Sequence, residues 1–162
     1  MMDAFERFGL IINDHVVRTP VAIASMAGIV DAAYVLARKE HIGAAFIGGY
    51  SIDGPTMDAA RAIAQAGERK EFLYADPETE LKSQIDKMAG SDVVLGLNLR
   101  GSSPEAYRSI AEKLGDSVVY EIDAHCRQQP MVAAGCGEHL LRHPQELAAT
   151  IRAFKTMDNN IS

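Results

Sequence analysis

The sequence predicts an α/β fold built from consecutive strand–helix units whose strands run in parallel. Short apolar runs that end in glycine or polar residues alternate with longer segments whose apolar positions recur at helical spacing. Strands joined by helical crossovers pair in parallel, because a two-residue hairpin cannot connect parallel strands. Four such units are visible in 162 residues, whereas a complete (βα)8 barrel takes about 250 residues. The expected fold class is therefore α/β, a (βα)4 half of a TIM barrel with parallel strands; a small doubly wound sheet of the same length is the alternative.

Composition places the chain among ordinary globular proteins. Hydrophobic residues make up 48% and charged residues 23% of the sequence, which excludes a disordered or collagen-like chain. A net charge of −6 argues against broad, sequence-independent nucleic-acid binding, which needs an excess of lysine and arginine. No apolar run approaches the ~20 residues that span a bilayer, and residues 1–7 do not resemble a signal peptide. We expect a single domain over residues 1–162, no membrane association, a cytoplasmic location and free cysteine thiols.

The first two units each contain one strand and one helix. The strands are expected at Val21–Met26 and Ala44–Tyr50, which are short apolar runs. Asp31 has the side chain of a helix N-cap, for a helix over residues 31–41 that ends before a glycine. A proline at the first turn opens the second helix, over residues 55–67.

The second half of the chain contains an extra helix and two more units. Asp76 and Pro77 form an N-cap and first-turn pair that opens the extra helix. The later elements are expected as a strand at 92–99, a helix at 103–114, a strand at 118–122, and helical segments over 135–157 with a break at Pro144.

Charged residues around the start of the extra helix are expected to be solvated. Lys70 and Glu71 lie in a segment, residues 68–76, that shows no clear periodicity. Glu78 and Lys82 have the i,i+4 spacing of a surface ion pair.

A half-barrel leaves an unpaired strand edge at each side of its sheet. Such edges invite pairing with another chain. No strand run follows Met157 except a stub at residues 160–162, so the sequence is expected to stop before a fifth strand. We therefore expect a homo-oligomer, or a chain that is truncated and lacks its C-terminal half.

Polar and small residues follow each predicted strand. In parallel α/β folds ligands bind beyond the carboxyl ends of the strands, so these residues are candidates for a shared pocket. The four strand ends are Met26–Gly28, Gly48–Tyr50, Asn98–Gly101 and Asp123–Cys126.

Four segments occur in the order of one known family. Residues 24–31 read A-S-M-A-G-I-V-D, residues 98–105 N-L-R-G-S-S-P-E, residues 122–126 I-D-A-H-C, and residues 135–144 G-C-G-E-H-L-L-R-H-P. They resemble A-P-M-A-G-V-T-D, Q-I-F-G-S-D-P-E, I-N-M-G-C and G-A-G-A-A-L-L-R-D-P of the tRNA dihydrouridine synthases. These flavin enzymes have a TIM-barrel catalytic domain and belong to a superfamily that includes dihydroorotate dehydrogenase-like proteins.

The resemblance implies an FMN-dependent oxidoreductase that reduces a pyrimidine-like C=C bond, with tRNA or a pyrimidine as its substrate. Asn98 stands where a family glutamine contacts the flavin ring, and Cys126 stands at the general acid that protonates the pyrimidine. A neutral thiol holds a transferable proton at about pH 7. The residues that correspond to the family's FMN-lining segment are Ala24, Ser25, Met26 and Ala27.

The sequence also departs from the family pattern. Asp123 replaces an asparagine, and an ionised carboxylate only accepts hydrogen bonds. His125 and Arg127 replace the glycine and proline on either side of the cysteine. These three residues are the candidate substrate-binding residues. The family's fifth to eighth strands, with the phosphate-binding loops, have no counterpart here, so we expect this chain alone to bind FMN weakly and to be an incomplete catalyst.

Two further interpretations remain open. One is a non-catalytic half-barrel that serves in assembly or binds a small ligand. The other is a zinc site, because Cys136, His139 and His143 share one helical face. Their spacing matches no standard set of zinc ligands, so we predict no metal; a buried Cys136 and two solvated histidines are the simpler expectation.

Overall fold

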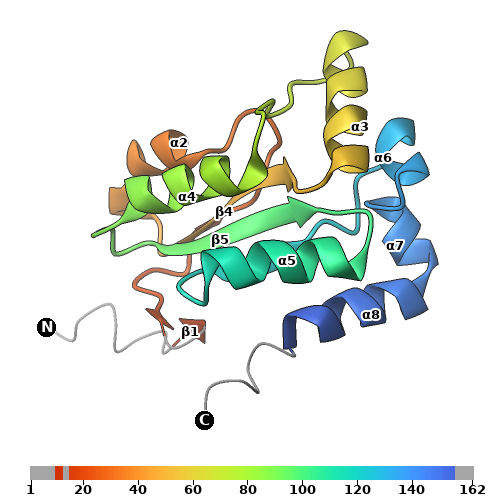
Figure 1. Ribbon diagram of the computed structural model, residues 1–162. Coiled ribbons are helices and arrows are strands. Elements are labelled where there is room, and N and C mark those ends of the chain that lie inside the picture. The colour runs from red at the N-terminus through yellow and green to blue at the C-terminus, as the bar shows by residue number, and fades with distance from the viewer. Residues whose placement is uncertain (1–9, 13–14, 156–162) are drawn as a thin grey trace, which may run out of the picture.

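The computed structural model describes residues 10–12 and 15–155 (Figure 1). The expectations for residues 1–7, for the helix end at Met157 and for the stub at 160–162 lie outside this part of the chain. In chain order the elements are β1 (Ile11–Ile12), β2 (His15–Val16), β3 (Ala22–Ile23), α2 (Ala32–Leu36), the 3-10 turn η1 (Lys39–His41), β4 (Ala44–Ser51), α3 (Gly54–Gln65), α4 (Pro77–Met88), β5 (Val94–Arg100), α5 (Pro104–Leu114), β6 (Val119–Ile122), α6 (Gln129–Ala133), α7 (Glu138–Arg142) and α8 (Pro144–Lys155).

The main sheet has four parallel strands in the order β3-β4-β5-β6. Neighbours in the sheet are therefore also neighbours in the sequence. A doubly wound sheet reverses its strand order at a switch point, whereas a barrel keeps consecutive strands side by side. The predicted α/β class, a (βα)4 half-barrel arrangement with parallel strands, is confirmed.

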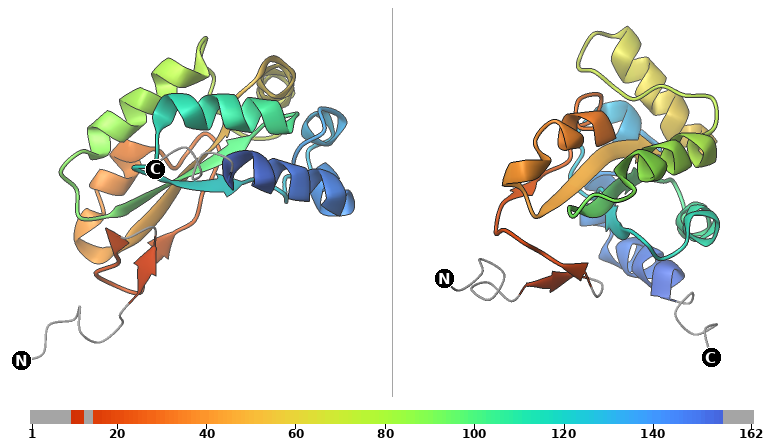
Figure 2. Two further views of the ribbon diagram at one scale, coloured as in Figure 1. Left: turned by 60° about the horizontal axis from the view of Figure 1, so that its bottom comes forward. Right: turned by 90° about the vertical axis from the view of Figure 1, so that its left-hand side faces the viewer.

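One face of the sheet is covered by helices α2, α4 and α5 (Figures 1 and 2). A single apolar core joins buried residues of these helices to alternate residues of the central strands. In β5 and the residue before it, the members of this core are Val93, Leu95, Leu97 and Leu99. Because side chains alternate along a strand, Gly96, Asn98 and Arg100 face the opposite side of the sheet, which is the interior side of a closed barrel.

A short antiparallel hairpin, β1–β2, was not expected from the sequence and lies beside the amino-terminal ends of the parallel strands (Figure 1). Val17, just after the hairpin, packs with Ala44 and Val94, the first residues of β4 and β5. The hairpin therefore covers the end of the sheet that is remote from the candidate pocket.

Side-chain caps fix where the helices begin. Asp31 accepts a hydrogen bond from the backbone N–H of Tyr34 at 2.8 Å, as predicted, and Asp76 caps α4 in the same way. Asp53 caps α3 and also accepts from the backbone and hydroxyl of Ser102, each at 2.7 Å. The start of α3 is thereby tied to the loop that follows β5.

Three elements differ from the sequence-based expectation. The first strand is only two residues long, because the carbonyl of Met26 accepts hydrogen bonds from Ile29 and Val30 and the chain turns there. Helix α2 ends at Leu36, and residues 39–41 form a separate 3-10 turn. A short helix, α6, occupies a segment expected to be a loop.

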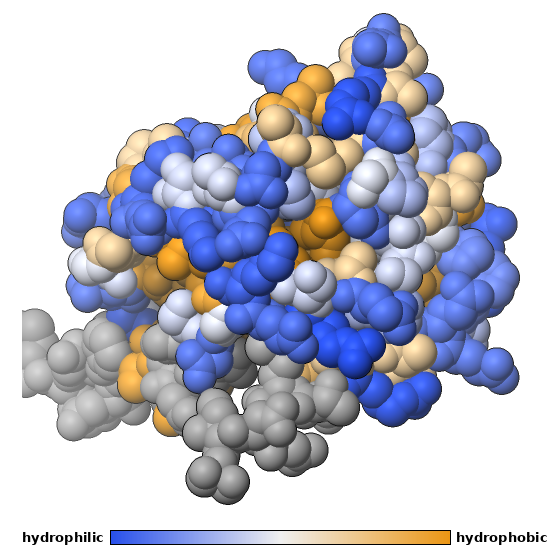
Figure 3. Space-filling view, viewed as in Figure 1, coloured by the Kyte–Doolittle hydropathy of each residue, from blue (hydrophilic) through white to orange (hydrophobic). Residues whose placement is uncertain are grey.

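The face seen in Figure 3 is mostly hydrophilic over α4 and α5, with apolar side chains visible in the gaps between the elements. Within residues 10–12 and 15–155, no helix combines the length and apolar character needed to cross a bilayer.

Candidate functional site

The loop between α3 and α4, residues 68–76, crosses the carboxyl ends of the parallel strands; we call it the edge loop. Its Glu71 carboxylate is fully buried and accepts hydrogen bonds from Arg100 at 2.6 and 3.3 Å and from Arg69 at 2.6 Å. The expectation that Glu71 is solvated is wrong, because Arg100 is itself fully buried at the end of β5 and needs a counter-ion. The expected Glu78–Lys82 ion pair is present at 2.7 Å.

Both guanidinium groups remain charged beside Glu71. Burial alone would lower the pKa of Arg100, but the hydrogen bonds and the charge of Glu71 outweigh it and raise the pKa. The same balance raises the pKa of Arg69. Arg100 also donates to the carbonyl of Gly49, which joins the end of β5 to the end of β4. The strand ends are therefore held by a buried ionic network.

Arg69 connects this ionic network to Cys126 by a hydrogen bond. Its guanidinium donates to the Cys126 sulfur, with an Nη2–Sγ distance of 3.2 Å. The thiol lies 3.4 Å from Oε1 of Gln128 and is only 3% exposed. Cys126 packs in a small apolar cluster with residues of α3 and α6, among them Ile63 and Met131. The thiol is thus at the carboxyl edge of the sheet, as predicted, but it is buried between helices.

Asp123 shapes the turn that presents Cys126. Its Oδ1 accepts from the backbone N–H groups of His125 and Cys126 at 3.1 and 3.0 Å, and lies 3.1 Å from the His125 ring. A carboxylate can accept all of these, which gives Asp123 a local role in the turn. His125 and Arg127, the other two candidate substrate-binding residues, are exposed.

Four buried side-chain polar atoms have no hydrogen-bond partner among the described residues, and all four lie in the last three residues of β4 or β5. Buried polar groups are nearly always paired, so such atoms call for a water or a ligand. Asn98 donates through Nδ2 to Glu121 at 3.0 Å, which leaves its Oδ1 as one of the four. The four atoms are Tyr50 Oη, Ser51 Oγ, Asn98 Oδ1 and Arg100 Nε.

An acceptor and a charged donor stand side by side in this set. A Cβ atom added at Gly49 would lie 2.7 Å from Asn98 Oδ1 and 2.8 Å from Arg100 Nε. Asn98 Oδ1 and Arg100 Nε, which both lack a hydrogen-bond partner among the described residues, therefore lie next to the backbone of Gly49. A side chain at residue 49 would fill the space beside them. The structure brings Asn98 to the same edge of the sheet as Cys126, and the network of Arg100, Glu71 and Arg69 spans the distance between them.

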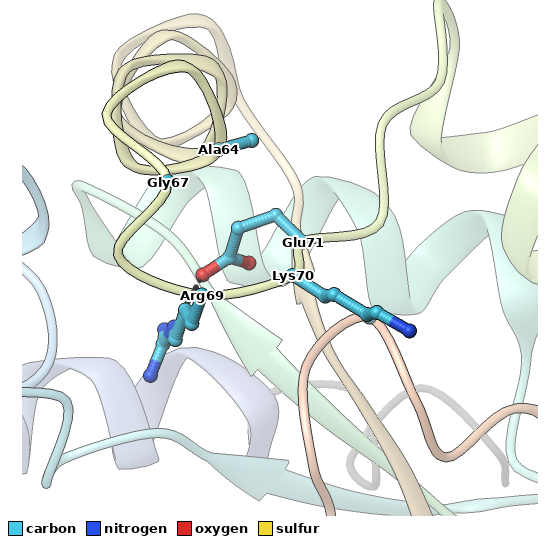
Figure 4. Close-up of a pocket in the computed structure, with 6 residues that line it drawn as sticks. Ala64, Gly67, Arg69, Lys70 and Glu71 are labelled. Atoms are coloured by element: carbon cyan, nitrogen blue, oxygen red, sulfur yellow. Dashed lines mark hydrogen bonds and ion pairs between the residues drawn. The ribbon is translucent and has the colours of Figure 1, made fainter.

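Residues 24–27 are more exposed to solvent than Asn98 and Cys126. Ala24 and Met26 are exposed, Met26 to 54%, while Ser25 and Ala27 are half-buried. The segment is followed by Gly28, against which the backbone of the edge loop packs. An open depression of about 520 Å³ lies here, and Figure 4 shows Arg69 and Lys70 pointing to opposite sides of the loop. Its lining residues are Gly28, Ala64, Gly67, Arg69, Lys70 and Glu71.

The contact at Gly28 makes a testable prediction. Gly28 and Gly67 both have φ +70°, but a Cβ at Gly28 would lie 2.5 Å from the Lys70 carbonyl carbon, whereas nothing lies within 4 Å at Gly67. Gly67→Ala should cost about 1–2 kcal/mol of unfolding free energy from backbone strain alone, and Gly28→Ala about 1–3 kcal/mol more from overpacking. Urea denaturation of both variants measures the difference. Equal destabilisation would show that the edge loop does not press on Gly28.

Cys136 is buried, as the simpler of the two expectations for this residue predicted. It is fully buried, its Sγ lies 3.4 Å from the carbonyl oxygen of Met131, and burial raises the pKa of its thiol to about 12. A thiol held in this way is a poor metal ligand, because metals bind the thiolate. The zinc set of Cys136, His139 and His143 is therefore not supported by the position of Cys136.

Sequence reasoning missed Arg69 and Glu71 as parts of the site, and it included Arg100 only as a member of the strand end Asn98–Gly101, without a role of its own. One signal was available: Arg100 ends a strand whose residues are otherwise almost all apolar and buried. A charge there requires a buried partner. Nothing in the sequence identified which acidic residue supplies it, because the partner comes from an irregular loop 29 positions away.

Comparison with known proteins finds a relative that this chain matches over part of its length. No family model matches the sequence, and no solved structure matches it. The sequence is 30% identical over 144 residues to an uncharacterized protein of Methanocaldococcus jannaschii, a match that covers 87% of this chain and 55% of the relative. The chain thus spans about half the length of that relative.

Proposed function

We propose that this chain is the first half of a flavin-dependent oxidoreductase barrel of the dihydrouridine synthase type, with Cys126 as the general acid that protonates a pyrimidine-like C=C bond. The observation that carries the proposal is that two unpaired buried polar atoms, Asn98 Oδ1 and Arg100 Nε, converge beside Gly49 at the ends of β4 and β5. These atoms lie in a segment, residues 98–105, that resembles the family pattern. Ligand sites of parallel α/β folds occur at this edge.

The residues at the strand ends offer the types of hydrogen-bonding group that an FMN ring needs. A flavin ring presents both N–H and C=O groups at its edge, and Asn98 Oδ1 and Arg100 Nε offer an acceptor and a charged donor to match. Ala24, Ser25, Met26 and Ala27 would lie along the cofactor, as the resemblance implies. The chain's own phosphate anchor is not among the matched segments, so binding is expected to be weak until a second half-barrel completes the site.

Bound FMN would supply the hydride for reduction of the C=C bond. The proton comes from Sγ of Cys126, and proton transfer leaves a thiolate there. Arg69, 3.2 Å from Sγ, stabilises that negative charge, and Glu71 holds the guanidinium in place at 2.6 Å. Arg69 acts on the acid and is a positioning residue, as is Asp123, which fixes the turn before Cys126.

Substrate access requires a movement of the edge loop. The Cys126 thiol is almost completely buried, and the side chain of Arg69, in the edge loop, covers it. The Arg69 side chain is itself partly exposed. A pyrimidine, free or in tRNA, would have to displace Arg69 to reach Sγ. His125 and Arg127 are exposed beside the thiol and are the groups that such a substrate would meet first.

The second half of the barrel is the partner that the proposal requires. The strands β3 and β6 are the edges of the four-stranded sheet, and unpaired edges favour association. A second copy of this chain, or a C-terminal half carrying strands five to eight, would close the barrel. A cytoplasmic location belongs to the same proposal, since the tRNA substrate of the family that the sequence resembles is found there.

Titration with FMN tests the proposal. Purified protein should be yellow, with an absorbance band near ~450 nm, or should quench the fluorescence of added FMN. Asn98→Ala should weaken FMN binding about 10-fold or more, since it removes both the orphan acceptor and the bond to Glu121. Gln65→Ala, an exposed change on α3, is the matched control. Circular dichroism checks that each variant is folded.

A colourless protein that fails to bind FMN at about 1 mM, a concentration that detects even a very weak site, would favour the alternative. In that case the chain is a non-catalytic half-barrel that serves in assembly or binds another small ligand. The burial of the Cys126 thiol and the saturation of the Glu71 carboxylate by two arginines are the observations that favour it.

A further inference from the structure

A second group of polar side chains lies at the junction of α7 and α8, outside the site described above. His139 is in α7, His143 is its C-cap and Glu146 is in the first turn of α8. The chain breaks between the two helices at His143, so the three residues are brought together by the turn from α7 into α8. One potential ligand atom from each residue lies within 4.8 Å of the other two.

One distance within this group already suits a common ligand. His139 Nε2 lies 3.0 Å from Glu146 Oε2. Two atoms bound to one zinc ion at about 2.0–2.2 Å each are roughly 3–3.5 Å apart. A nitrogen and an oxygen ligand are therefore already at the spacing that coordination requires. The two imidazole rings lie face to face, with centroids 4.0 Å apart and planes 19° apart.

The tautomer of His143 is fixed in the form that a metal ligand needs. Its Nδ1 lies 2.8 Å from the carbonyl oxygen of His139. A carbonyl can only accept, so Nδ1 carries the hydrogen, and in the neutral imidazole the lone pair is on Nε2. Histidines that bind metals usually donate their other ring N–H to a carbonyl or carboxylate, which fixes the ring orientation.

The ion pair described for Glu146 is with His139, another member of the group, at 3.0 Å. Arg142, which lies between the two histidines in sequence, pairs with Glu138 at 3.1 Å. The side chains of His139 and Glu146 are 26% and 56% exposed, so water can complete a coordination sphere.

We propose that His139, His143 and Glu146 form a binding site for a divalent transition-metal ion of the zinc class. Two imidazoles and one carboxylate are ligands that zinc, cobalt and nickel accept, whereas calcium and magnesium prefer oxygen alone. The site holds three protein ligands and leaves a position for water. This proposal is independent of the flavin proposal.

Such an ion would join α7 to α8. The start of α7 is tied to the candidate acid, because the backbone N–H of Glu138 donates to the carbonyl of Cys126 at 2.9 Å. Helix α8 packs against α5 on the helical face of the sheet. The metal would therefore anchor the segment that follows Cys126 to the body of the fold.

Calorimetric titration with Zn²⁺, in the presence of a reductant that does not bind metal, tests the proposal. The unmodified protein should bind about one ion per chain, and His143→Ala and Glu146→Gln should each weaken binding about 10-fold or more. Zinc should raise the melting temperature of the unmodified protein and leave that of the two variants nearly unchanged. His41→Ala, a change of an exposed histidine in η1, is the matched control and should bind zinc as the unmodified protein does.

Three results would overturn the proposal. One is an absence of binding at about 1 mM Zn²⁺. Another is undiminished binding by both His143→Ala and Glu146→Gln. The third is loss of binding in Cys136→Ala with retention in His143→Ala, which would move the site to the thiol. Circular dichroism of the variants shows that any loss of binding comes from a folded protein.

Discussion

Glu71→Gln is expected to lower the free energy of unfolding by about 3–5 kcal/mol, the usual cost of removing one partner of a buried ion pair. The substitution keeps the size of the side chain and one oxygen acceptor. It removes the negative charge that two guanidinium groups share, and Arg100 is fully buried with no other carboxylate bonded to it among the described residues. The cost arises mainly from the uncompensated positive charge of Arg100, since Arg69 is partly exposed and can turn to water.

Urea denaturation measures this effect, and Glu78→Gln is the matched control. Glu78 pairs with Lys82 and Lys113 at the surface, so its neutralisation should move the unfolding midpoint far less. In a double variant, Glu71→Gln with Arg100→Met, the loss should be smaller than the sum of the two single losses, because no charge is left buried. If Glu71→Gln unfolded at the same urea concentration as the control, the carboxylate would be solvated, as the sequence alone suggested.

The parts of the fold that were predictable are those fixed by local chemistry. Prolines and cap residues set the starts of α3, α4 and α5 within a residue or two, because their backbone preferences act on neighbours in sequence. The apolar run of β5 identified a strand covered on both faces. The β1–β2 hairpin was missed because its two-residue strands are too short to show any period. The length of β3 was overestimated because the chain turns at Met26 through hydrogen bonds that the apolar run does not reveal.

The candidate site was predictable to a smaller extent. Strand ends could be located, so Asn98, Asp123 and Cys126 were expected at one edge, and the structure brings them there. What the sequence could not show was the path of the edge loop, because residues 68–76 have no periodicity and take their position from tertiary contacts with Gly28 and Arg100. A charge in such a segment is exposed or buried according to what it meets across the fold.

Cys126→Ala is expected to lower turnover by about 10²–10⁴-fold, the usual contribution of a positioned general acid. The assay contains the protein, FMN, a reductant, and uridine-containing RNA or free uridine, and it measures reduction of the pyrimidine. Alanine removes the thiol that Arg69 contacts and leaves a small apolar side chain in an apolar cluster. The fold should therefore survive, and FMN binding should be retained.

Two companion variants separate an acid role from a packing role. Cys136→Ala truncates the other thiol of the same cluster, which is fully buried and bonded to Met131, and should leave the catalytic step unchanged. Arg69→Met keeps Cys126 but removes the cation 3.2 Å from its sulfur, so it should slow the proton transfer without abolishing it. Equal losses in Cys126→Ala and Cys136→Ala would mean that the cluster only packs. Undiminished turnover in Cys126→Ala would assign the proton to another donor, and the exposed His125 beside the thiol would be the next group to change.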